Sequence, residues 1–146
     1  MQKLLLPCVT LLVTAHPDDE VLFFSPLLSQ FMVKEKRGCD KELHILCLST
    51  GNAEGLGEVR VGELYAAAAL FGLDRAHVTV VDHPSLQDGM NTQWPVEVVA
   101  DMVLQQARRL SAQLVVTFDA QGASGHLNHI ATHHGVRGDV VEVTRG

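Results

Sequence analysis

Cysteine is scarce in this 146-residue chain, and its pattern argues against a disulfide framework or a structural cysteine-based zinc site. The three cysteines, Cys8, Cys39 and Cys47, are odd in number, and none of them stands in a Cys-x-x-Cys pair. Disulfide-stabilised domains and zinc fingers need paired, closely spaced cysteines. The sequence therefore indicates reduced thiols in a reducing compartment.

Basic and aromatic residues are also few. The chain has 11 Lys and Arg against 17 Asp and Glu, a formal net charge of −6, and only 5% of its residues are aromatic. A nucleic-acid-binding surface needs clustered positive charge to neutralise phosphates, and single strands are often held by aromatic rings that stack on bases. We therefore expect no nucleic acid among the partners.

Long apolar runs are absent as well. No stretch reaches the roughly 18 consecutive apolar residues that a membrane-spanning helix requires. The run over residues 4–15 is shorter and is interrupted by Pro7. Because 47% of the residues are hydrophobic, the chain can still bury a core, and its length predicts a single domain over residues 1–146.

Short apolar runs typical of strands buried on both faces occur four times along the chain. They are found at Leu11–Ala15, Leu43–Leu48, His77–Asp82 and Leu114–Phe118. A fifth segment, Asp139–Thr144, alternates like an edge strand.

Helical patterns separate these runs. The first is predicted to start at Ser25-Pro26, as N-cap and first helical residue, and to end near Lys36. Others are predicted over residues 58–71, with Gly72 at the C-terminal cap, and from Pro95 to Leu110. Alternating strands and helices predict right-handed βαβ units and an α/β fold, a Rossmann-like three-layer αβα sandwich with a mostly parallel sheet.

Two polar clusters follow the first and fourth of the predicted strands. Residues 16–20 read His-Pro-Asp-Asp-Glu, and His126 and His129 stand three apart after the fourth strand. Taken singly, the acids are also typical of a helix N-terminus, and the histidines of a protein surface. Parallel strands bring both clusters to one edge of the sheet, and two histidines with a carboxylate are the ligand set of a catalytic zinc ion.

The strings AHPDDE at residues 15–20 and SGHLNH at 124–129 resemble the N-acetylglucosaminyl-phosphatidylinositol de-N-acetylase family of PIG-L/LmbE-like zinc deacetylases, in its eukaryotic branch. The resemblance covers about residues 10–132. It extends through Ser49-Thr50-Gly51-Asn52, Arg60-x-x-Glu63-Leu64, Gln93-Trp94 and Val115-Val116-Thr117-Phe118-Asp119. It implies an LmbE-like fold and hydrolysis of an N-acetyl group.

The resemblance also implies roles for five residues. His16, Asp19 and His129 would hold Zn²⁺ or another divalent metal. Asp18 would be the general base toward an attacking water, and His126 would stabilise the oxyanion of the tetrahedral intermediate.

Four further residues are candidates for substrate contact or for support of the site. Arg60 is the natural partner of an inositol phosphate, with a helix-surface arginine as the alternative interpretation. Asn52 and Asp119 lie in the loops at the same edge. Asn128 stands where bacterial relatives commonly carry Asp, and would orient a histidine without adding charge. Glu20 is expected to be a helix-start acid rather than a ligand.

The implied substrate is the glycolipid N-acetylglucosaminyl-phosphatidylinositol, whose deacetylation is the second step of glycosylphosphatidylinositol (GPI) anchor synthesis. The implied location is a membrane surface, the cytosolic face of the endoplasmic reticulum. Because the resemblance ends near Ala131, we expect the domain to be incomplete at its C-terminus. The alternative function is therefore that of a catalytically inactive, truncated family member that acts as a binding module or has no function.

Other interpretations of the sequence are weaker. Gly55-Leu56-Gly57 begins like a dinucleotide-binding fingerprint, but Arg60 replaces the third glycine. A non-haem iron oxygenase shares the ligand set but is usually an all-β barrel. Of the remaining histidines, we expect His44 and His77 to be structural or exposed, and His133 and His134 to be incidental.

Overall fold

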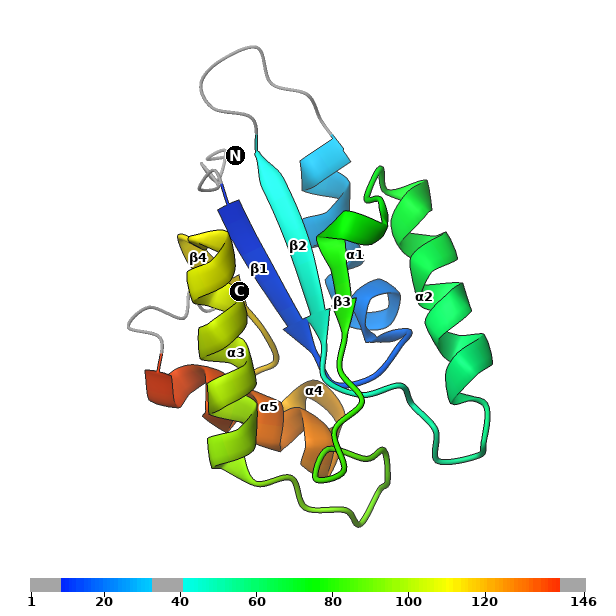
Figure 1. The fold of residues 1–146 in the computed structure, drawn as a ribbon, viewed down its shortest axis with the longest axis vertical. Helices are drawn as coiled ribbons and strands as arrows, with labels where there is room; N and C mark the ends of the chain where they lie inside the picture. Colours follow the sequence, from blue (N-terminus) through cyan, green and yellow to red (C-terminus); the bar gives the residue numbers. More distant parts are fainter. Residues whose placement is uncertain (1–8, 33–40, 140–146) are drawn as a thin grey trace.

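Four parallel strands form the centre of the protein in the computed structural model, which describes residues 9–32 and 41–139 (Figure 1). The spatial order is β3-β2-β1-β4. The strands are β1 (Val9–Thr14), β2 (Glu42–Cys47), β3 (Val78–Val80) and β4 (Leu114–Val116). Each neighbouring pair is parallel, and β1 pairs with β2 along its whole length. The predicted parallel sheet is confirmed.

Helices cover both faces of this sheet and complete the predicted three-layer α/β sandwich. One layer holds α1 and α2, and the other holds α3 and α5. The bounds are α1 (Asp19–Met32), α2 (Gly57–Leu70), the 3₁₀ helix η1 (Arg75–His77), α3 (Val96–Leu110), α4 (Gly122–Gly125) and α5 (Leu127–Asp139). Gly72, at φ +80°, follows the end of α2 as expected.

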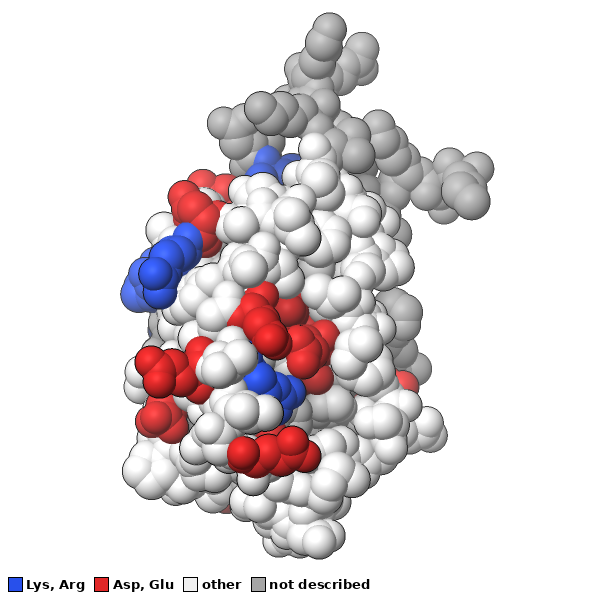
Figure 2. Space-filling view, turned by 90° about the vertical axis from the view of Figure 1, so that its right-hand side faces the viewer, with Lys and Arg blue, Asp and Glu red and all other residues white. Residues whose placement is uncertain are grey.

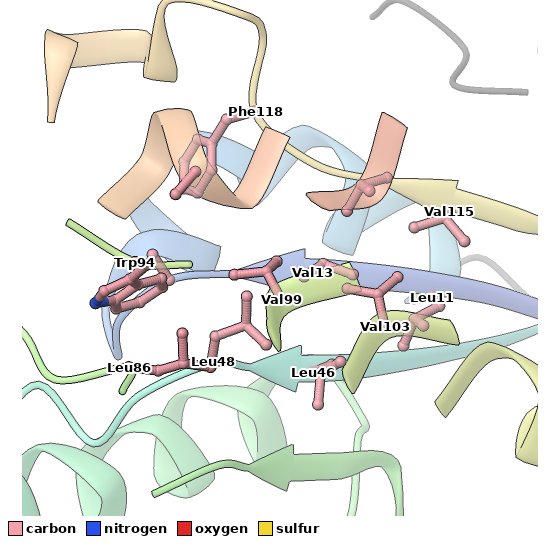
Figure 3. Close-up of a cluster of buried hydrophobic side chains, with 13 residues drawn as sticks. Leu11, Val13, Leu46, Leu48, Leu86, Trp94, Val99, Val103, Val115 and Phe118 are labelled. Atoms are coloured by element: carbon pink, nitrogen blue, oxygen red, sulfur yellow. The ribbon is translucent and has the colours of Figure 1, made fainter. Parts of the chain in front are cut away.

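The apolar core lies on both sides of the sheet, because successive side chains of a strand point to opposite faces. Leu11 and Val13 of β1 belong to the cluster that contains Val99 and Val103 of α3 (Figure 3). Leu12, between them, belongs instead to the cluster on the α1 and α2 side. This double burial explains why the strands are continuous apolar runs rather than alternating ones.

The start of α1 corrects the prediction at Ser25-Pro26. The helix begins at Asp19, and Pro26 lies inside it. Ser25 Oγ donates a hydrogen bond to the Val21 carbonyl oxygen, 2.6 Å away, instead of capping a helix start. The first turn is acidic, as the helix dipole favours, and this signal outweighed the Ser-Pro pair.

Two other predicted boundaries lie partly or wholly outside the described residues. The expected helix end near Lys36 falls in the gap between residues 32 and 41. The edge strand expected at residues 139–144 also falls outside, except that Asp139 is the last residue of α5. Among the described residues, no helix is both long enough and apolar enough to cross a membrane.

Charge on the face shown in Figure 2 is mixed. Acidic side chains are prominent there, and basic side chains lie beside them. The chain as a whole carries a formal charge of −6. Neighbouring charges of opposite sign limit any positive potential that the basic groups on this face could create.

Candidate active site

The loops that follow the strands meet at the end of the sheet toward which the arrowheads of β1 and β2 point, where α4 lies (Figure 1). His16 follows β1, while His126 and His129 follow β4. Their rings form one cluster, with centroids 4.8 Å apart for His16 and His126, 5.3 Å for His16 and His129, and 4.9 Å for His126 and His129. The structure therefore brings together the two sequence clusters.

The carboxylate of Asp19 completes a compact group of possible metal ligands. His16, Asp19 and His129 are all buried, and each offers one ligand atom within 4.8 Å of the others. Asp19 Oδ2 accepts hydrogen bonds from the backbone N–H groups of Ala15 (3.0 Å) and His16 (2.8 Å). Its other oxygen, Oδ1, lies 3.3 Å from His129 Nε2. The end of β1 thus fixes the carboxylate in place.

His129 is held from two sides in a way that leaves Nε2 free to act as a ligand. Its ring stacks on Phe118, with centroids 4.1 Å apart and an angle of 5° between the planes. Nδ1–H donates to the Gly122 carbonyl oxygen at 3.0 Å, while the buried Nε2 has no well-formed hydrogen bond. Burial opposes the charged ring, but the adjacent Asp19 carboxylate outweighs it and raises the pKa of His129. The Asp19 carboxylate would likewise stabilise a cation bound at Nε2.

His16 is oriented by side chains on its other ring nitrogen. Nε2 lies 2.9 Å from Asn128 Oδ1 and 3.0 Å from Asp88 Oδ1, so Nε2–H is the donor and the lone pair is on Nδ1. Nδ1 lies 3.8 Å from Asp19 Oδ2. A hydrogen-bonded second nitrogen is the usual arrangement of a metal-binding histidine.

Asp88 is a residue that the sequence analysis did not single out. Its nearly buried side chain contacts His16 and also lies 3.2 Å from Arg60 Nη1. His16, Asp88 and His126 form a second possible ligand group that shares His16 with the first. Because Arg60 already neutralises Asp88, a cation is better balanced by Asp19. The position of Asp88 in the loop after β3, at the same sheet edge, was the signal that could have identified it.

Arg60 links three loops at this edge. Nη1 donates to the Gly51 carbonyl oxygen at 2.8 Å and to Asp88 Oδ2, and Nη2 donates to the Pro17 carbonyl oxygen at 2.9 Å. Nη2 also lies 3.7 Å from Asp18 Oδ2. The guanidinium group therefore supports the site directly, and its expected contact with an inositol phosphate stays a prediction.

Asn52 and Asp119 shape the loops in which they stand. Asn52 Oδ1 accepts from the Gly57 N–H at 2.9 Å, at the start of α2. Asp119 Oδ1 accepts from the N–H groups of Gln121 (3.1 Å) and Ala123 (3.0 Å), at the start of α4. Both side chains belong to exposed residues, and their roles as substrate contacts remain predictions.

Asp18 and His126 are the two residues for which the resemblance implies roles as general base and oxyanion stabiliser. Asp18 has a φ of +89°, and its side chain is 53% exposed. His126 Nδ1 accepts from the Asn128 N–H at 3.1 Å, so the neutral ring carries its proton on Nε2. Burial, together with the neighbouring His16 and His129, lowers the pKa of His126. Its ring is therefore suited to donate a hydrogen bond in the neutral form.

Glu20 is the second residue of α1 and is almost completely buried. Neither of its carboxylate oxygens has a hydrogen-bond partner. Burial is the main cause that raises the pKa of Glu20 to about 7. The position agrees with a helix-start acid, as expected, although its burial was not expected.

Gly122 fixes the position of His129, and a side chain there is expected to disturb the site. A Cβ at Gly122 would lie 2.9 Å from His129 Cβ and 3.0 Å from the Ile130 backbone nitrogen. When zinc is supplied in excess, we expect the Gly122→Ala chain to bind one ion fewer than the wild-type chain, measured by elemental analysis. Gly125→Ala is the matched control: its φ is also positive (+78° against +66°), but nothing lies within 4 Å of its Cβ. Equal zinc contents in the two variants would contradict this account.

The sequence of the chain matches a known protein family. The family model described as PIG-L, GlcNAc-PI de-N-acetylase, matches residues 11–138. The chain is 44% identical over 125 residues to a probable N-acetylglucosaminyl-phosphatidylinositol de-N-acetylase of Schizosaccharomyces pombe, covering 86% of this chain and 49% of the relative. It is 38% identical over 129 residues to the N-acetylglucosaminyl-phosphatidylinositol de-N-acetylase of Bos taurus, covering 88% and 49%.

A solved structure supports the fold. The N,N'-diacetylchitobiose deacetylase of Pyrococcus horikoshii superposes with a TM-score of 0.70 at 18% identity, covering 88% of this chain and 48% of that one. This chain thus spans about half the length of the relatives that it matches. The family model covers most of the chain, including the residues of the histidine cluster. The chain therefore belongs to the PIG-L (GlcNAc-PI de-N-acetylase) family.

Proposed function

We propose that the chain hydrolyses the N-acetyl group of N-acetylglucosaminyl-phosphatidylinositol, in a zinc-dependent reaction that gives glucosaminyl-phosphatidylinositol and acetate. Relatives at 44% and 38% identity are named as a probable N-acetylglucosaminyl-phosphatidylinositol de-N-acetylase and as an N-acetylglucosaminyl-phosphatidylinositol de-N-acetylase, respectively. The observation that carries the proposal is the buried group of His16, Asp19 and His129, with one ligand atom of each within 4.8 Å of the others.

The residues present fit a zinc ion. Two imidazoles and one carboxylate are a common protein ligand set of catalytic zinc, which keeps a further position open. The buried Nε2 of His129 makes no well-formed hydrogen bond and lies 3.3 Å from Asp19 Oδ1, so a cation held between these two atoms would contact both. When bound there, zinc supplies Lewis-acid polarisation of the acetamide carbonyl and of water.

The chain's own residues would supply the proton transfers. The exposed Asp18 carboxylate accepts a proton from the attacking water, whose oxygen then bonds to the carbonyl carbon. His126 Nε2–H donates a hydrogen bond to the oxygen on which negative charge develops. The C–N bond breaks, a proton passes from Asp18 or His126 to the leaving amine, and acetate is released.

Orientation of these groups comes from the surrounding hydrogen bonds. Asn128 and Asp88 hold His16 Nε2, and Arg60 joins Asp88 to the loop that carries Asp18. Such fixed geometry supports rate enhancement, since misplacement by about 1 Å can lower a rate about 100-fold. A phosphoinositide substrate would place the protein at a membrane surface, and we propose the cytosolic face of the endoplasmic reticulum.

Acetate release from N-acetylglucosaminyl-phosphatidylinositol in detergent micelles tests the proposal. We expect the purified chain to release acetate, to lose this activity after chelation, and to regain it when zinc is added back. A folded, zinc-loaded chain that binds the glycolipid without releasing acetate would be a binding module, which is the alternative function. Acetate release that is unaffected by complete metal removal would contradict zinc dependence.

A further inference from the structure

Outside the active site, a further group of side chains that could bind a metal ion lies toward the opposite end of the sheet. Glu42 and His44 stand two residues apart in β2, so they point to the same face of the strand. His77 ends η1 directly before Val78, which pairs with Ile45 in the sheet, so His77 lies beside His44. Glu42 and His44 are the first and third of the six residues of β2, so about 16 Å and about 10 Å of strand, respectively, separate them from its active-site end at Cys47.

The distances within this group suit a metal ion. Glu42, His44 and His77 each offer one ligand atom, and these atoms lie within 4.8 Å of one another. His44 Nε2 is 3.1 Å from Glu42 Oε2, and the rings of His44 and His77 have centroids 4.7 Å apart. Two ligand atoms at about 2.0–2.1 Å from a tetrahedral zinc ion lie roughly 3.3 Å apart, so the Glu42 and His44 atoms are already close to that spacing.

Asp74 orients His77 in the manner of an outer partner of a metal-binding histidine. Its Oδ1 accepts the Nδ1–H of His77 at 2.6 Å and also the N–H of Ala76 at 3.0 Å. The lone pair of the neutral His77 ring is then on Nε2, which is left for a metal ion.

The surroundings leave room for an ion to enter. The side chain of His44 is 10% exposed, whereas that of Glu42 is 51% exposed and that of His77 is 28% exposed. The group is thus anchored in the sheet on one side and open to water on the other. Water can therefore complete the coordination, as it does at metal sites with three protein ligands.

We propose that Glu42, His44 and His77 form a second metal site, for a divalent cation of the zinc class. Mixed imidazole and carboxylate ligands favour zinc and its late first-row neighbours over calcium or magnesium. The ion takes the place of the proton between His44 Nε2 and Glu42 Oε2, and the neutral His44 ring then carries its proton on Nδ1. It joins β2 to η1 at the β3 edge of the sheet.

Zinc stoichiometry in the full chain tests this site separately from the active site. At saturating zinc we expect about two ions per wild-type chain, one in His129→Gln and one in His77→Gln. His77 is partly exposed, so its replacement leaves the core intact, and His44→Gln provides a second variant that keeps a polar side chain. His134→Gln, at an exposed histidine of α5, is the matched control and should keep both ions.

Replacement of Asp74, the hydrogen-bond partner of His77, provides a second test of this site. Asn at position 74 keeps an oxygen for the Ala76 N–H but removes the negative charge beside His77. We expect Asp74→Asn to weaken zinc binding at the second site about 10-fold, measured by titration in the His129→Gln chain. In that chain, zinc at a hundredfold excess over its dissociation constant should raise Tm by about 5–10 °C, and His77→Gln should abolish the rise.

The outcomes separate the two sites. A wild-type chain that binds one zinc ion, lost in His129→Gln and kept in His77→Gln and His44→Gln, would overturn the second site and leave the proposed function untouched. A chain that binds one ion, lost in His77→Gln and kept in His129→Gln, would support the second site and overturn the ligand set of the active site. Zinc binding that is unchanged in every variant would overturn both assignments.

Discussion

Replacement of Asp18 by asparagine is expected to lower the rate of acetate release by about 10²–10⁴-fold while leaving zinc bound. Asp18 stands next to Asp19, a proposed ligand, but belongs to neither of the possible ligand groups that contain His16. Asparagine keeps the size of the side chain and tolerates the positive φ of +89° better than alanine. The variant therefore removes the proton acceptor with little change in the backbone.

Steady-state kinetics together with metal analysis checks this expectation. A lost general base lowers kcat, whereas a lost substrate contact raises KM with kcat unchanged. Asp101→Asn, at an exposed position of α3, is the control for the removal of one carboxylate and should retain the wild-type rate. A rate for Asp18→Asn within about threefold of wild type, with zinc bound, would exclude Asp18 as the base.

Much of the fold was predictable because burial on both faces leaves a simple mark in the sequence. The runs around Leu12, Ile45 and Val115 are apolar without alternation, and they form β1, β2 and β4 of the parallel sheet. Once the strands are parallel, their following loops must meet at one edge. That rule was sufficient to predict that His16 and His129 lie close together.

The remaining features depend on contacts between segments far apart in the sequence. Asp88 lies in a polar loop with no motif of its own, and its link to the site consists of side-chain contacts to His16 and Arg60. Arg60 could be interpreted from its charge as a phosphate partner, but its hydrogen bonds go to the loops around it. Ser25-Pro26 is a good helix start by local chemistry, yet the acids before it begin the helix earlier.

The same dependence on tertiary contacts applies to the proposed metal site of Glu42, His44 and His77. Nothing in the sequence pairs His44 with His77, which are separated by a whole helix, because their contact follows from the pairing of β2 with β3. Each of these histidines taken alone fits the expected structural or exposed role. Only the register of the two strands places two imidazoles and a carboxylate together.

Replacement of His129 by glutamine is expected to remove one zinc ion per chain and to lower acetate release by about 10³-fold or more. Loss of the Lewis acid removes several kcal/mol of stabilisation from the transition state, and each 1.36 kcal/mol corresponds to a factor of ten. Glutamine keeps much of the volume against Phe118 and retains a donor for the Gly122 carbonyl oxygen. Elemental analysis and the acetate assay measure the two effects, with His134→Gln as the control.

The two possible ligand groups share His16, and the His129→Gln variant distinguishes between them. If the ion is held by His16, Asp19 and His129, then His129→Gln loses the active-site zinc, whereas Asp88→Asn retains it and changes only the contacts of Asp88 with His16 and Arg60. If the ion is held instead by His16, Asp88 and His126, the two variants exchange their results. Arg60 neutralises Asp88 but not Asp19, and for that electrostatic reason we expect the first outcome.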